Sequence, residues 1–114
     1  MNRIVTCINS CVILCTLWAS IIYAQIPVFI LSWGSQGTAD GQFMYPGGVA
    51  SDADGNVYVV DIGNHRVQKF TSSGEFLLKW GSRGSDDGQF SYPMGVTLDA
   101  GGNVYIGDGG NHRI

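Results

Sequence analysis

The chain has 114 residues and a formal net charge of −3, and its 17 glycines far outnumber its three prolines and three cysteines. All nine carboxylates and five of the six basic residues follow Ala24, and the basic residues are scattered. Because nucleic-acid binders depend on clustered Lys and Arg side chains, this composition disfavours nucleic acid as a partner. The cysteines all precede Ala24, so the remainder can form no disulfide.

The first 24 residues are predicted to be a secretory signal peptide or a membrane anchor. Arg3 is their one charged residue, and a largely apolar stretch runs from Ile4 to Ala24. A positive end, an apolar core and a cut after Ala24 are typical of a signal peptide. The stretch also has the length of about 20 residues that crosses a bilayer, so a retained transmembrane helix is the alternative. Either reading places residues 25–114 outside the cytosol, secreted, periplasmic or membrane-anchored, with membrane contact only through residues 4–24.

A 47-residue unit then occurs almost twice. When Trp33 is aligned with Trp80, residues 29–67 match residues 76–114, and 25 of the 39 positions are identical. A period of this length is typical of repeat architectures, in which each copy buries its apolar face only against neighbouring copies.

Within one period, turn signals separate four runs of residues with strand propensity. The Asp54-Gly55 pair predicts a tight hairpin with a primed turn, which requires positive φ. No helical periodicity occurs after residue 25. Four short antiparallel strands per period predict an all-β fold in which each unit forms one blade of a β-propeller. The expected strands are residues 48–52, 56–61, 65–70 and 76–80.

The stretch from residue 81 to 93 is predicted to cross from the outer strand of one blade to the inner strand of the next. Its aromatic residues Phe90 and Tyr92, like Phe43 and Tyr45 in the first copy, are expected to pack between adjacent sheets. The inner strands carry small side chains, as required where blades converge on a central channel.

The segment from Pro46 to Asp61, continued by Gly63–Phe70, closely resembles the NHL-repeat family. The second copy matches through Ile114, so the resemblance covers about residues 28–114. It implies a propeller that is usually six-bladed. The second copy departs from the first by having glycine at three positions, which are 101, 107 and 109.

The expected domain plan is a segment at residues 1–24 followed by a partial propeller at 25–114. Repeat units are expected at about 34–80 and 81–114, and residues 28–33 are expected to form an outer strand that completes another blade. The chain is accordingly interpreted as the N-terminal piece of a longer propeller.

Two polar clusters recur at the same place in each unit. A His flanked by Asp and Arg could perform acid–base chemistry or bind a metal. Alternatively, the Asp and Asn cap a turn while the Arg and His brace one blade against another. Recurrence favours the structural interpretation, and no catalytic, cofactor-binding or metal-binding residue is predicted. The clusters are Asp61, Asn64, His65 and Arg66, and Asp108, Asn111, His112 and Arg113.

The resemblance implies a non-catalytic scaffold that holds a protein or small ligand without a cofactor, and Tyr45 and Tyr92 are the candidate binding-loop residues. The alternative is a metal-dependent propeller enzyme similar to lactonases or to the peptidyl-hydroxyglycine lyase. Its ligands would project from the inner strands, yet Gly48–Asp52 and Gly95–Asp99 contain neither His nor Glu. Such a site would lie mostly in blades outside this sequence.

Overall fold

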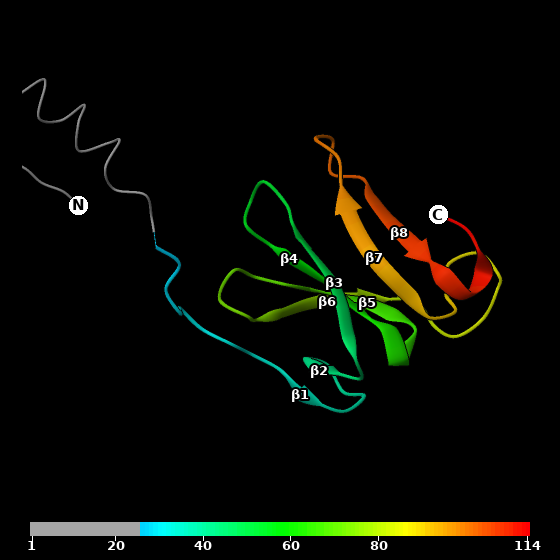
Figure 1. Cartoon of the computed structure of the whole chain (residues 1–114), viewed down its shortest axis with the longest axis horizontal. Coiled ribbons are helices and arrows are strands. Elements are labelled where there is room, and N and C mark those ends of the chain that lie inside the picture. The colour runs from blue at the N-terminus through cyan, green and yellow to red at the C-terminus, as the bar shows by residue number, and fades with distance from the viewer. Residues whose placement is uncertain (1–25) are drawn as a thin grey trace, which may run out of the picture. The chain divides into compact units, whose positions relative to one another are not determined.

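The computed structural model describes residues 26–114, and residues Leu31–Ile114 form one compact unit (Figure 1). The prediction for residues 1–24 lies outside the described residues. Within the described part, no helix is long and apolar enough to span a membrane. The elements are β1 (Ser35–Gln36), β2 (Gln42–Phe43), β3 (Pro46–Ser51), β4 (Val57–Asp61), η1 (Ile62–Asn64), β5 (Arg66–Phe70), β6 (Phe76–Trp80), β7 (Pro93–Leu98), β8 (Val104–Asp108) and η2 (Gly109–Asn111).

Strands β3 to β6 form an antiparallel sheet in sequential order, which we name the first blade. Strands β7 and β8 pair in the same way and form the described part of the second blade. The all-β propeller prediction is therefore confirmed, and the four strands of the first blade lie within two residues of their expected ends. This agreement reflects the strong turn signals between the strands.

The hairpin between β3 and β4 differs from the predicted primed turn. The Gly55 amide donates to the Asp52 carbonyl at 3.0 Å, and the Asp52 amide donates to the Asn56 carbonyl at 3.0 Å. Only Gly55 has positive φ, at 83°, whereas Asp54 does not. Residues 53–55 therefore form a three-residue hairpin loop. Its β-turn, closed between Asp52 and Gly55, ends in a bulge at Gly55, which is the usual form of such loops.

Side chains alternate along β4, and each face of the strand contributes to a different apolar core. Val59 and Phe70 pack with Phe43 on one face of the first blade, where Trp33 also covers them. On the other face, Tyr58, Val60 and Val67 pack against Ile106 of β8, and Phe90 and Trp80 border this core. The second core lies between the two blades and joins them.

The inner strands β3 and β7 approach each other closely. A Cβ atom added at Gly48 would lie 2.9 Å from the Gly95 Cα atom and 3.0 Å from the Met94 carbonyl oxygen. Glycine is needed at position 48 because a side chain there would meet the backbone of β7.

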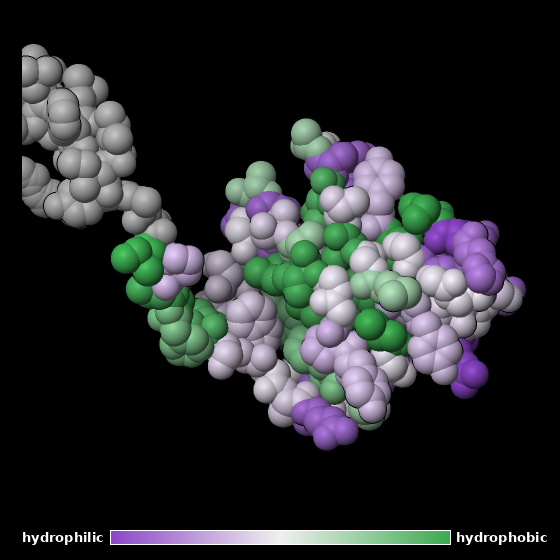
Figure 2. Space-filling view, viewed as in Figure 1, coloured by the Kyte–Doolittle hydropathy of each residue, from purple (hydrophilic) through white to green (hydrophobic). Residues whose placement is uncertain are grey.

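Residues 26–34 form no strand in the structure. The outer strand expected at 28–33 would complete a blade whose other strands are not among the described residues, so it stays a prediction for this segment. Its apolar side chains are exposed and appear as the green stretch that follows the grey residues in Figure 2. In addition, Phe43 and Phe90 pack as predicted, but Tyr45 is 76% exposed and Tyr92 is 52% exposed.

Candidate functional site

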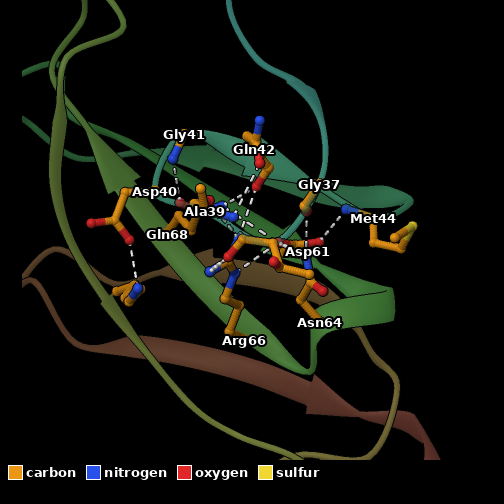
Figure 3. Close-up of polar contacts among 12 residues, drawn as sticks. Gly37, Ala39, Asp40, Gly41, Gln42, Met44, Asp61, Asn64, Arg66 and Gln68 are labelled. Carbon is orange, nitrogen blue, oxygen red and sulfur yellow. Dashed lines mark hydrogen bonds and ion pairs between the residues drawn. The ribbon is translucent and has the colours of Figure 1, made fainter.

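Asp61, at the end of β4, is the centre of the first polar cluster (Figure 3). Its carboxylate is fully buried, and Oδ1 accepts a hydrogen bond from the Met44 amide at 2.7 Å. Oδ2 accepts from the Asn64 side chain at 2.8 Å and from Arg66 Nε at 2.8 Å. Each acceptor of this carboxylate therefore has a protein donor, as a buried charge requires.

The Arg66 guanidinium binds backbone oxygens of the loop that precedes the first blade (Figure 3). Nη1 donates to the Thr38 carbonyl at 2.9 Å, and Nη2 donates to the carbonyls of Ala39 at 3.0 Å and Gln42 at 2.9 Å. Gln68 strengthens the same attachment, because its side chain donates to the Gln42 carbonyl at 2.7 Å. The cluster fastens this loop to the end of its own blade.

The second cluster repeats this arrangement. Asp108 accepts from the Ser91 amide at 2.7 Å, from Asn111 at 2.8 Å and from Arg113 Nε at 2.9 Å. Burial alone would raise the pKa of the Asp108 carboxyl, but the hydrogen bonds from Asn111, Ser91 and Arg113 outweigh it and lower that pKa. The guanidinium of Arg113 also donates to three carbonyls of the crossing loop, which are those of Ser85, Asp86 and Gln89.

His65 points away from Asp61 and Arg66, its neighbours in the motif, and toward the second blade. Its Nδ1 atom accepts a hydrogen bond from the Tyr92 amide at 3.1 Å, and its ring meets the Tyr92 ring edge-on at 4.6 Å between centroids. The donors to Asp61 are Met44, Asn64, Arg66 and, at 3.4 Å, Gln68, and they do not include His65. The clustered sequence motif therefore separates in space, since Asp61 and Arg66 hold the preceding loop while His65 contacts the following one.

Residues 26–114 contain no group of three or more His, Cys, Asp or Glu side chains arranged to hold a metal ion.

Sequence reasoning missed a third recurring network at the hairpin turns. Asp52 accepts hydrogen bonds from the side chain and amide of Asn56, from the Tyr58 hydroxyl and from the Asp54 amide. The hydrogen bond from the Asn56 side chain contributes most to lowering the pKa of Asp52 to about 2, and burial opposes it. Lys69 lies 3.6 Å from the same carboxylate. The signal was present, because Asp, Asn and Tyr recur with the same spacing at positions 99, 103 and 105.

The two candidate binding-loop tyrosines hold equivalent places before the inner strands. Tyr45 and Tyr92 both have left-handed backbone angles, with φ of 59° and 49°, and each precedes the proline that opens its strand. The Ile62 amide donates to the Tyr45 carbonyl at 3.2 Å, which places this residue beside η1. A shallow hollow of about 480 Å³ next to Tyr45 is lined also by Trp33 and Phe43.

A family model described as NHL repeat matches residues 43–70 and 90–114. Three curated relatives show the same likeness. They are the B-box type zinc finger protein ncl-1 of Caenorhabditis elegans, 38% identical over 53 residues, the E3 ubiquitin-protein ligase TRIM71 of Rattus norvegicus, 46% identical over 52 residues, and the protein brain tumor of Drosophila melanogaster, 38% identical over 53 residues.

Each match covers 46% of this chain but only 5% or 6% of the relative. NHL repeats typically form scaffolds that bind protein or RNA, so the comparisons give no support to the exclusion of nucleic acid on charge grounds. The repeated motif, the four-stranded blade and the two matches to the family model agree, and the chain belongs to the NHL-repeat family.

Proposed function

We propose that this protein is an exported or membrane-anchored, non-catalytic NHL scaffold that holds a protein or small ligand at the blade edge carrying Tyr45 and Tyr92. The observation that supports this proposal is the contrast between the two sets of recurring residues. Asp61 and Arg66 bind the protein's own backbone, whereas Tyr45 is 76% exposed. Residues that are bound internally stabilise the blade, and exposed aromatic residues remain available to a partner.

The structural role proposed for the polar clusters follows from their hydrogen-bond partners. Arg66 donates to three backbone carbonyls and to Asp61, so little of its capacity is left for a substrate or anion. The same pattern in the second copy fits a function needed once per blade. Catalysis needs its groups only once per protein.

The binding proposal is tested by site-specific crosslinking in the full chain. We would introduce the photo-crosslinker benzoylphenylalanine at position 45 or 92, and at Leu78 on β6 as a control that is also exposed. A partner crosslinked from 45 and 92 but not from 78 would then be purified and titrated calorimetrically. We expect Y45A and Y92A each to weaken binding about tenfold, since a buried aromatic contact contributes 1 kcal/mol or more. Equal crosslinking from all three positions would refute this binding edge.

The proposed location is tested separately. A reporter enzyme that folds only outside the cytosol, fused after Ile114, would be active if residues 1–24 direct export. Deletion of residues 1–24 would abolish its activity. An active reporter after the deletion would contradict export through this segment.

RNA is the competing ligand, because NHL repeats bind protein or RNA. Titration of the chain with single-stranded RNA would give an affinity that falls steeply with salt if phosphate contacts dominate.

A further inference from the structure

We propose that the contact between His65 and Tyr92 is an acid-sensitive latch between consecutive blades, which holds while the imidazole is neutral and releases when it is protonated. The inference rests on the fold and is independent of the proposed function. It starts from the hydrogen bond in which the Tyr92 amide donates to Nδ1 of His65 at 3.1 Å.

The latch joins parts of the molecule that are distant in sequence. His65 lies between η1 and β5 of the first blade, and Tyr92 lies immediately before β7 of the second. His65 is 8% exposed, and its ring packs on the Tyr92 ring at an interplanar angle of 65°. His65 thus fixes the start of the inner strand of the next blade.

The two repeats provide an internal comparison. His112 has the same left-handed backbone as His65, with φ of 55° against 54°, so this conformation belongs to the repeat itself. His112 is nevertheless exposed, whereas His65 is buried. Tyr45, the counterpart of Tyr92, is likewise more exposed than Tyr92. Burial of the histidine and of the tyrosine therefore arises from the contact between consecutive blades.

The protonation state follows from the chemistry of the ring. A neutral imidazole has one donor and one acceptor nitrogen, and an imidazolium has two donors. Since Nδ1 accepts from the Tyr92 amide, the proton of the neutral ring lies on Nε2. Addition of a proton to Nδ1 places two N–H groups opposite each other and removes the hydrogen bond.

The charged groups around the latch offer an imidazolium no ion pair. On its own strand, Arg66 is paired with Asp61 at 2.8 Å. On the second blade, Asp108 is paired with Arg113 at 2.9 Å and also accepts from the amide next to Tyr92. Tyr92 adds only a neutral phenol. In the described chain no carboxylate forms an ion pair with His65, so protonation is not compensated.

The test uses the full chain labelled with ¹⁵N, together with two matched variants, H65N and H112N. Asparagine suits a left-handed backbone, and its side-chain oxygen can accept a hydrogen bond at any pH in this range. Long-range ¹H–¹⁵N correlation spectra report the tautomer of His65. Hydrogen exchange of the Tyr92 amide, corrected for its intrinsic rate, reports the latch at pH values of about 7.5 and 5.5, which span the range where histidine titrates.

We expect an unprotonated Nδ1 at the higher pH, and protection of the Tyr92 amide that falls about tenfold on acidification, because a proton-linked opening changes by up to tenfold per pH unit. H112N should behave like the wild type, and H65N should retain its protection at both values. The latch is refuted if His65 carries its proton on Nδ1 at the higher pH, or if wild-type protection does not change. Both of these outcomes are measured on the wild type, so the latch can be refuted even if H65N fails to fold.

Discussion

Asp61 and Asp108 hold the same place in their repeats, yet the arginines paired with them differ in exposure. The Arg66 side chain is 8% exposed and that of Arg113 is 38% exposed. An exposed arginine can be solvated by water when its partner is lost, whereas a buried one cannot. The value of the pair for stability therefore depends on its burial.

This difference predicts unequal effects of the same substitution. D61N should lower the free energy of unfolding by about 3 kcal/mol, because it leaves Arg66 as an unpaired charge in the protein interior. D108N should lower it by about 1 kcal/mol or less. Urea denaturation followed by tryptophan fluorescence measures both losses. Equal losses would show that burial of the arginine does not decide the cost.

The aspartates at the two hairpin turns predict how the stability of the fold depends on pH. Hydrogen bonds, first of all from Asn56 and Asn103, lower the pKa values of Asp52 and Asp99 from 3.8 to about 2. Because these pKa values are depressed in the folded state, the carboxylates stabilise it above pH 3.8, and this contribution is lost as the pH falls toward about 2.

We therefore expect the urea midpoint of the wild type to fall over this pH window, and the double variant D52N/D99N to show a shallower fall. D54N is the matched control, since the Asp54 side chain accepts no hydrogen bond in the described chain. The hypothesis would be contradicted by a double variant as acid-sensitive as the wild type.

At the residue scale, the sequence correctly marked the recurring motif but not the directions of its side chains. Asp61 and Arg66 contact the loop before their blade, and His65 contacts the loop after it. Neighbours in a strand point to opposite faces, and the left-handed backbone of His65 redirects the chain once more. Such turns depend on φ values that a single sequence does not specify for non-glycine residues.

At the scale of elements, strands with strong turn signals could be predicted and the strand without a local partner could not. Strand β6 formed as expected because β5 precedes it by one tight turn. The segment at 28–33 has a similar sequence but no neighbouring strand among the described residues. Strand propensity reflects how well side chains pack on a pleated sheet, so a segment with high propensity forms no strand without a neighbouring strand to pair with.

The hairpin between β7 and β8 offers a paired test of two adjacent glycines. Gly101 replaces Asp54 of the first copy and has no positive φ, and a Cβ atom there would meet only ordinary contacts at 3.4 Å or more. Gly102 has φ of 84°. G101A should therefore stabilise the chain by about 0.5 kcal/mol through the unfolded state, whereas G102A should destabilise it by about 1 kcal/mol. Thermal unfolding would measure both, and a G101A variant less stable than the wild type would overturn the argument.

At the scale of the whole molecule, the repeat explains both the blade and its association. One copy supplies a four-stranded sheet with two apolar faces, and one of these faces is covered by the second copy. The sequence predicted this stacking because a 47-residue period implies neighbours. The distance between the inner strands could not be predicted. Both strands carry glycine, so the sequence does not say at which residue they touch, and this depends on how the blades are tilted.

The contact point can be tested with matched glycines on the two inner strands. A methyl group at Gly48 would lie within 3.1 Å of backbone atoms of Met94, Gly95 and Val96, whereas one at Gly95 would meet nothing within 4 Å. Backbone cannot yield as a flexible side chain does, so G48A must separate the blades and should destabilise the chain by about 1–3 kcal/mol. G95A should change stability by less than about 0.5 kcal/mol. Urea denaturation gives the stabilities, and hydrogen exchange of the β7 amides shows whether the blades have separated. If G48A keeps both its midpoint and its β7 protection, the inner strands do not meet at Gly48.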